Sequence, residues 1–271
     1  MNAGVPIPYY SLSIPAAVIA FYLAYAVYHW EVGERGLAKR DIFSAVQVVA
    51  MIGIVWLLFI AANYVVSQVL GVGTSVEAAW RALDDAARKF DEIYRKCVDW
   101  ILYIAWARGV LATVPYVSSL SDVLGSATLW ETWAFSFAST TFLALKWLAV
   151  IMTYLHPWLL TFGAALTVSD RLRAVGGAML AIYLVMGAAL VLIANHAYSH
   201  TIESREFSDV DPFGAAVNPA EWPSVAARAD GPANTAIYIS VFAMVAMTMA
   251  GIVTAGISSA LGSIAVMIRP V

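Results

Sequence analysis

IFSAVQVVAMIGIVWLLFIAANYVVSQVLGVGTSV, residues 42–76, runs for thirty-five residues without an Asp, Glu, Lys or Arg, and a second such stretch covers the thirty-eight residues 231–268. A helix rises about 1.5 Å per residue and the bilayer core is roughly 30 Å thick, so about 20 residues cross it. The whole chain is 62% hydrophobic and 12% charged, whereas a soluble domain has about 25% charged residues. The sequence therefore predicts a multi-pass membrane protein.

We predict an all-α, polytopic transmembrane bundle that forms a single domain over residues 1–271. Charged residues, Pro and Gly divide it into six spans, at about 9–30, 42–70, 98–117, 133–154, 174–194 and 235–268. Residues 118–131 are expected to form a loop or a re-entrant turn, and 195–234 an acidic soluble loop too polar to hold a core. The role of residues 155–168 and the orientation stay open, and we expect a location in a prokaryotic plasma membrane.

Residues 75–99 differ in kind from these spans. Eleven charged residues lie between Glu77 and Asp99, and apolar residues recur among them at alternating spacings of four and three. Such a heptad pattern is typical of an amphipathic helix with a partner on its apolar side. We expect this helix to project from the membrane, to continue into the third span, and to mediate assembly of a homo-oligomer through Trp80, Leu83, Phe90 and Tyr94.

The last span carries a stripe of small residues at helical spacing that includes Gly251, Ala255 and Gly262. In lipid, small residues let two helix backbones approach closely. We expect tight helix packing there, within the chain or between copies.

Two basic residues are predicted to lie at membrane depth, Arg108 and Lys146, with Asp122 and Glu131 near enough in sequence to pair with them. A charge near the centre of a spanning helix costs roughly 2.5 to 3.5 kcal/mol on insertion scales. These four residues either line a polar translocation path or form structural ion pairs at the membrane boundary.

The histidines offer little metal chemistry. His196, His200 and Glu203 share one helical face, but a stable zinc site needs three or four ligands and supporting contacts, so we predict no metal and no cofactor. His29 and His156 stand next to aromatic residues and are expected at the membrane interface.

Motifs for catalysis are absent from the sequence. It has no G-x-x-x-x-G-K-[ST], no HExxH, no nucleophile elbow and no span with paired carboxylates, and its single cysteine excludes an internal disulfide. We therefore expect no enzyme activity, and any transport must draw its energy from another protein.

The order of features over residues 154–181 carries a family resemblance. A Pro-containing helix end with Pro157 is followed by Gly163, a basic turn at 170–173 and Gly176-Gly177 at the start of the next helix. With the heptad helix and six spans, this arrangement resembles the polytopic inner-membrane channel subunit of type IV secretion systems, in the archaeal Ced DNA-exchange form known as the CedA family.

That resemblance implies a channel or scaffold component of a DNA-transfer machine, with DNA as the translocated substrate. It also implies membrane lipids, small pilin-like subunits and a separate hexameric ATPase as partners. A small secondary transporter or ion channel, or an assembly factor that transports nothing, are the alternatives.

Overall fold

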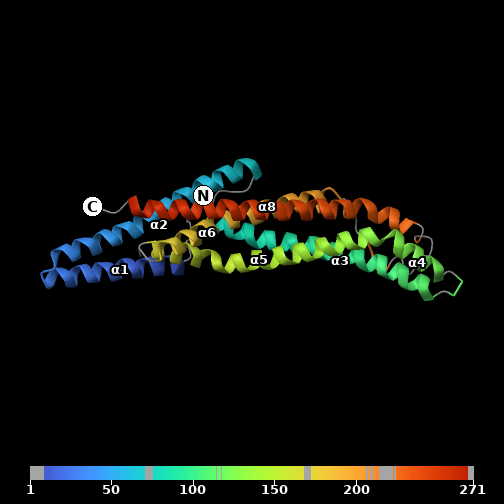
Figure 1. Ribbon diagram of the computed structural model, residues 1–271, viewed down its shortest axis with the longest axis horizontal. Coiled ribbons are helices and arrows are strands. Elements are labelled where there is room, and N and C mark those ends of the chain that lie inside the picture. Colours follow the sequence, from blue (N-terminus) through green and yellow to red (C-terminus); the bar gives the residue numbers. More distant parts are fainter. Residues whose placement is uncertain are drawn as a thin grey trace, which may run out of the picture. The chain divides into compact units, whose positions relative to one another are not determined.

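The computed structural model describes residues 9–70, 76–113, 115–116, 118–167, 172–205, 207, 210–213, 222 and 224–267. This part of the chain is helical and contains no β-strand. In chain order the helices are α1 (Tyr9–Glu31), α2 (Arg35–Leu70), α3 (Val76–Thr113), α4 (Ser118–Ala127), α5 (Leu129–Thr167), α6 (Arg173–Tyr198), the π-helix η1 (Ser199–Glu203) and α8 (Val225–Met267) (Figure 1).

Three helical segments are long and apolar enough to cross a membrane: Leu129–His156, Arg173–Glu203 and Val225–Leu261, with 28, 31 and 37 residues. Each exceeds the roughly 20 residues that a bilayer core requires. The expectation of a membrane protein built from helices is therefore supported, while the count of six spans stays a prediction. Many side chains of α1 and α2 lie outside the described residues.

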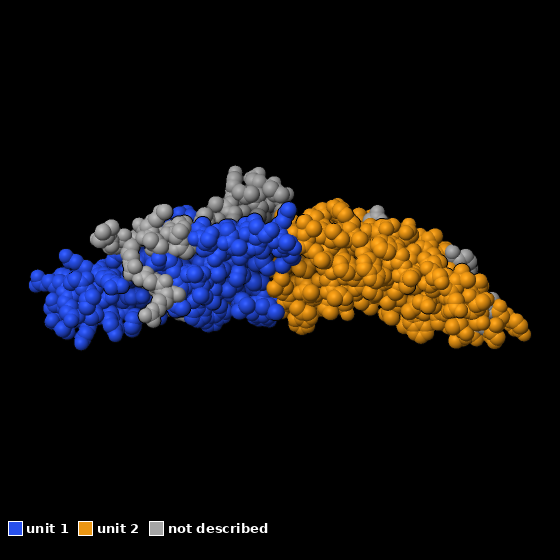
Figure 2. Space-filling view, in the orientation of Figure 1, with its two compact units in different colours: residues 1–83, 151–189, 247–271 blue, residues 84–150, 190–246 orange. Residues whose placement is uncertain are grey.

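The chain divides into two compact units, and the expectation of a single membrane domain stays a prediction (Figure 2). Unit 1 comprises residues 1–83, 151–189 and 247–271, and unit 2 comprises residues 84–150 and 190–246. Most of the charged stretch of α3 and the segment between α6 and α8 belong to unit 2. The predicted spans 9–30 and 42–70 belong to unit 1.

In unit 1, α1 packs against α2, and a glycine makes the turn between them. Gly33 has φ +87°, a left-handed conformation that glycine adopts without strain. The Glu34 N–H donates to the carbonyl of His29 at 2.8 Å, which satisfies one of the free carbonyls at the end of α1. Helix α2 then begins at Arg35, ahead of the apolar span predicted to start at residue 42.

Helices α5 and α6 approach closely through two glycines of unit 1. A Cβ atom on Gly176 would lie 2.6 Å from the backbone nitrogen of Thr167 and 2.7 Å from the carbonyl oxygen of Gly163. A Cβ atom on Gly163 would lie 2.9 Å from the side chain of Leu180. Gly163 and Gly176, two of the residues that carried the family resemblance, thus have a packing role in this structure.

Unit 2 has an aromatic and aliphatic core between α3 and α5. The Trp100 ring stacks on Phe135 with centroids 5.6 Å apart, and Phe90 lies 6.0 Å from Phe142. All four side chains are at most 1% exposed. Helix α3 is thus a packed helix along this stretch, and the structure does not show it as the projecting helix that we expected.

Two segments differ from their predicted form. Residues 118–131 contain α4 and the first turn of α5 instead of a loop. Helix α5 also continues unbroken to Thr167, so the segment that begins at residue 155, whose role the sequence left open, is helical as far as residue 167. The predicted loop 195–234 is helical at both ends. Helix α6 and η1 extend into it as far as Glu203, and α8 begins at Val225 and includes Pro232. A buried seam at Val225, Ala229, Ala233 and Ala236 stabilises this start of α8 and outweighs the hydrogen bond that proline cannot donate.

Candidate functional sites

Lys146 of α5 forms an ion pair with Asp91 of α3 in unit 2. Its Nζ lies 2.7 Å from Asp91 Oδ1, and the side chains are 27% and 22% exposed. Arg95 approaches the other oxygen of Asp91 at 2.9 Å. The hydrogen bond from Lys146, followed by that from Arg95, lowers the pKa of Asp91 below its ordinary value. Of the two interpretations that the sequence left open for Lys146, this geometry is that of a structural ion pair.

A second lysine, Lys89 of α3, contacts residues of α6. Lys89 Nζ donates to Asn195 Oδ1 at 2.7 Å, forms an ion pair with Asp85 at 2.9 Å, and lies 5.5 Å from the centre of the Tyr198 ring. The charged side of α3 therefore contacts polar residues on both α5 and α6. We call the set Asp85, Lys89, Asp91, Lys146 and Asn195 the polar layer.

Arg108 lies apart from this layer and packs on α4. A Cβ atom on Gly125 would lie 2.7 Å from Arg108 Nη2, so the guanidinium rests on the glycine, and Ser121 Oγ donates to the Arg108 carbonyl at 3.1 Å. Arg108 and Asp122 are both exposed. Among the described residues, neither Asp122 nor Glu131 pairs with Arg108 or Lys146, so the predicted pairing within these four residues is wrong.

Glu131 lies buried in the first turn of α5, with 7% of its surface exposed. Its Oε2 atom has no hydrogen-bond partner among the described residues. The free N–H groups at a helix start favour a negative charge nearby, which compensates part of the cost of burial.

The apolar seam of α3 is covered within the chain. Leu83 is 1% exposed, Phe90 is fully buried and Tyr94 is half-buried, while the side chain of Trp80 lies outside the described residues. Leu83 and Phe90 therefore need no second copy to shield them from water, and the expected oligomer stays a prediction without their support.

The stripe of small residues on α8 faces outward. Gly251 and Ala255 are exposed, and a Cβ atom on Gly251 would meet nothing within 4 Å. The side chain position of Gly262 lies outside the described residues. Tight packing within the chain is thus wrong for the first two residues, and packing between copies stays a prediction.

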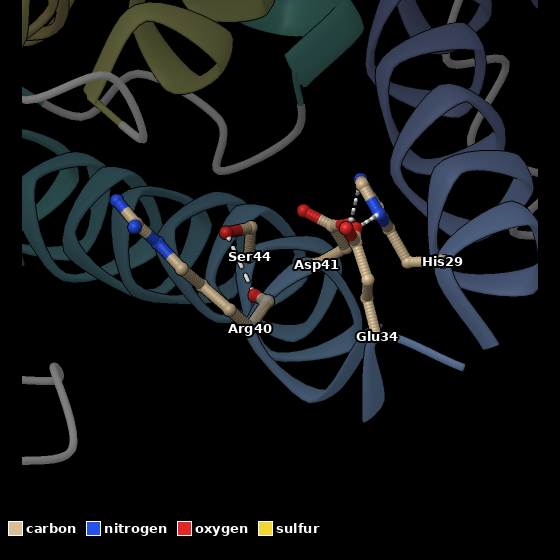
Figure 3. Close-up of polar contacts among 5 residues, drawn as sticks. All are labelled: His29, Glu34, Arg40, Asp41 and Ser44. Atoms are coloured by element: carbon tan, nitrogen blue, oxygen red, sulfur yellow. Dashed lines mark hydrogen bonds and ion pairs between the residues drawn. The ribbon is translucent and has the colours of Figure 1, made fainter. Parts of the chain in front are cut away.

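The isolated histidines predicted at the membrane interface have partners. His29 Nδ1 lies 2.7 Å from Glu34 Oε2, and its Nε2 lies 3.8 Å from Asp41 Oδ2 (Figure 3). The contact with Glu34 is within hydrogen-bond distance, whereas the contact with Asp41 is too long for a hydrogen bond. This cluster fastens the end of α1 to the start of α2.

His156 is buried in the protein, with 2% of its surface exposed inside unit 1, while the predicted position of both histidines at the membrane interface stays a prediction. Its ring lies 4.0 Å from that of Tyr183 on α6, and its Cε1 atom would lie 3.3 Å from a Cβ placed on Gly187. It is a core residue between α5 and α6.

His196 and His200 lie at the end of α6, where the helix widens into η1. Their ring centroids are 4.2 Å apart, and Tyr238 of α8 places its hydroxyl 3.4 Å from His196 Nε2. An open pocket of about 540 Å³ lies beside them, lined by Ser199, His200, Ser204, Asn234, Thr235 and Tyr238. Among the described residues, no three His, Cys, Asp or Glu side chains gather closely enough to hold a metal ion, and Glu203 does not complete such a set.

The residues that sequence reasoning missed share one property, which is that they lie far along the chain from their partners. Asp91 is 55 residues from Lys146, Asn195 is 106 residues from Lys89, and Tyr238 is 42 residues from His196. No local pattern could have indicated these pairs. Pi-helical turns often lie at functional sites, but η1 leaves no sequence signature of its own.

The chain matches no protein-family model, no curated protein and no solved structure. Its function is therefore inferred from its own residues and geometry.

Proposed function

We propose that this protein is a multi-pass membrane scaffold subunit of a translocation machine that has its ATPase on another chain. One observation carries the proposal: α3, the most charged helix, is tied by the polar layer to α5 and α6, which are long and apolar enough to span a membrane. Intramembrane or membrane-boundary charges are costly and are kept where they pair or serve transport.

The geometry favours a scaffold over a path that grips its substrate. Lys146 is paired with a carboxylate, so its charge is not available to a passing polyanion. A path for nucleic acid would need a wide and hydrated channel with free basic groups, which requires several copies of the chain. On the resemblance of residues 154–181, we propose DNA as the cargo and pilin-like subunits and an ATPase as the partners.

A DNA-transfer assay with matched variants tests this proposal. In cells that lack the endogenous gene, we expect Lys146→Met to lower transfer of a chromosomal marker together with the protein level, because it breaks a structural pair. Arg88→Met serves as the control, since Arg88 is 74% exposed and, within the part of the chain that the structure describes, forms an ion pair with Asp84 alone. Normal transfer by cells without the protein would exclude the proposed cargo.

Affinity capture of the full chain from detergent-solubilised membranes tests the partners. Recovery of an ATPase and of small helical membrane subunits supports a machine component. Recovery of the chain alone, under conditions that preserve its fold, would contradict the scaffold role.

Glu131 favours a second candidate function, a small ion-coupled transporter. A buried carboxylate without a hydrogen-bond partner is a residue type that proton pathways use. Vesicles that contain this protein alone would then conduct protons, and Glu131→Gln would abolish the flux. Tight vesicles with wild-type protein would exclude this candidate.

A further inference from the structure

The pocket beside the end of α6 lies where the exposed surface of α8 changes from polar to apolar. Asp230 and Asn234 are exposed on the early turns of α8. Large apolar side chains are exposed on the turns that follow, and within unit 2 these are Val241, Met244 and Val245, each 48 to 50% exposed. Asn234, Thr235 and Tyr238 line the pocket, which therefore lies at the boundary between the two regions.

Both helices of the pocket are longer than a membrane crossing requires. The candidate spans Arg173–Glu203 and Val225–Leu261 have 31 and 37 residues, whereas about 20 residues cross the hydrocarbon core. Helices of this length place their polar ends among the lipid head groups. Tyr238 suits such a boundary, because its half-exposed side chain combines an apolar ring with a polar hydroxyl.

The pocket is lined by neutral hydrogen-bonding groups. Four of its six lining residues carry a hydroxyl, one carries an amide and one an imidazole. Several hydrogens are donated within the protein: Ser199 Oγ donates to the His196 carbonyl at 2.9 Å, and Ser204 Oγ donates to the carbonyl one turn earlier at 2.8 Å. Asn234 Nδ2 lies 3.3 Å from Asp230 Oδ1 and donates to it. Hydroxyl and amide oxygens carry lone pairs that accept, so the lining favours an uncharged ligand that donates hydrogen bonds.

We propose that this pocket binds the neutral, hydroxyl-rich head group of a membrane lipid of the glycosyl class, whose hydrocarbon chain lies along Val241, Met244 and Val245. Sugar hydroxyls donate to the oxygen acceptors of the lining, and the C–H face of a sugar ring packs on the Tyr238 ring. A phosphate diester only accepts hydrogen bonds and finds few donors here. An ammonium group lacks a carboxylate in the lining, which would offset the cost of removing its charge from water.

This proposal shares only the membrane placement of α6 and α8 with the proposed scaffold function. It does not depend on the cargo or the partners of that function. A failure to bind the lipid would leave membrane integration standing, whereas release of the protein from membranes without detergent would remove both.

The test is native mass spectrometry of the full chain, purified in an amine-oxide detergent so that no detergent sugar competes for the pocket. The probes are digalactosyl diacylglycerol, phosphatidylcholine and phosphatidylethanolamine with the same acyl chains. We expect one digalactosyl diacylglycerol molecule per chain to bind in preference to both phospholipids. Equal binding of the three lipids would mean that the hydrocarbon alone decides, and a preference for phosphatidylethanolamine would assign the pocket to an ammonium group. Either result, or no bound glycolipid, would overturn the proposal.

Matched variants locate the binding at this pocket. Thr235→Val and Tyr238→Phe each remove one hydroxyl with little change of shape, and each should weaken glycolipid binding by about three- to tenfold. Thr254→Val on α8 and Tyr154→Phe on α5 remove the same groups outside the pocket and should bind as the wild type does. Equal affinity in all four variants would contradict the assignment.

Free galactose separates a lipid site from a site for soluble sugars, and it is tested on the wild type. An excess of galactose should leave the glycolipid bound, because the free sugar lacks the chain that contacts α8. Displacement by galactose at the concentration of the glycolipid would assign the pocket to a soluble sugar and overturn the proposal. This measurement holds whether or not the variants fold.

Discussion

At the scale of single residues, the account depends on where the charges of α3 are neutralised. Asp91 receives hydrogen bonds from Lys146 on α5 and Arg95 on its own helix, while Lys89 uses both Asp85 and Asn195. Partial burial of these charged groups is stable because each forms hydrogen bonds in addition to an ion pair with a group of opposite charge. These contacts hold α3 in one register against α5 and α6.

The Asp91–Lys146 pair should be energetically coupled. We expect Asp91→Asn and Lys146→Met each to lower the free energy of unfolding by about 1 to 2 kcal/mol, since each leaves one half-buried charge with a weaker partner. The double variant should lose less than the sum of the two. Denaturant unfolding of the detergent-purified protein measures this cycle, and strict additivity would contradict the pair.

The same pair predicts a dependence on acid. Because Lys146 holds the pKa of Asp91 below its ordinary value of 3.8, the folded state binds this proton less readily than the unfolded chain does. The stabilisation is therefore complete above that ordinary value and disappears as the pH falls through the lowered pKa. The melting temperature of wild type should exceed that of Asp91→Asn at pH 6 and converge with it in strong acid, and a constant difference would be contrary evidence.

At the scale of elements, the contact between α5 and α6 is the most sharply constrained. Gly176→Ala would place a methyl group 2.6 Å from backbone of α5, so the helices must separate, at a cost of about 1 to 3 kcal/mol. Gly256→Ala is the control, because its Cβ would meet nothing and alanine favours a helix. Thermal unfolding should show loss only for the first variant, and equal melting temperatures would refute the close approach.

The reactivity of the single cysteine, Cys97, reports on the packing of α3. Cys97 is fully buried, and burial raises the pKa of its thiol, so little reactive thiolate forms at neutral pH. We expect the folded protein to resist a maleimide reagent until it is denatured. In a C97A background, R95C should react at once, since the Arg95 side chain is 73% exposed. Rapid labelling of Cys97 would mean that α3 is not packed as the structure shows.

Sequence alone identified the all-helical class, the continuity of α3 from residue 76 to 113, and the apolar helices later found as candidate spans. These follow from charge-free length and periodicity, which are local properties. It placed Lys146 with the wrong partner, because pairing with Asp91 depends on the register between two helices. The first turns of α8, around Pro232, were predicted as part of a loop. The prolines of this segment are visible in the sequence, whereas the burial that stabilises the helix depends on tertiary packing.

At the scale of the whole molecule, each compact unit has a character of its own. Unit 1 holds the apolar helices α1 and α2 and the glycine contact of α5 with α6, whereas unit 2 holds the polar layer and the histidine pair. A division of this kind suits a membrane protein that also offers a polar surface for assembly. The six spans and the homo-oligomer remain predictions that follow from the sequence.

Membrane integration is the claim on which the rest depends, and an alkaline carbonate wash of membranes from cells that express the chain tests it most directly. Carbonate removes peripheral proteins but leaves helices that cross the bilayer in place. We predict that the protein stays in the pellet and dissolves only when detergent is added. Release into the carbonate supernatant, as a folded protein that needs no detergent, would contradict the account.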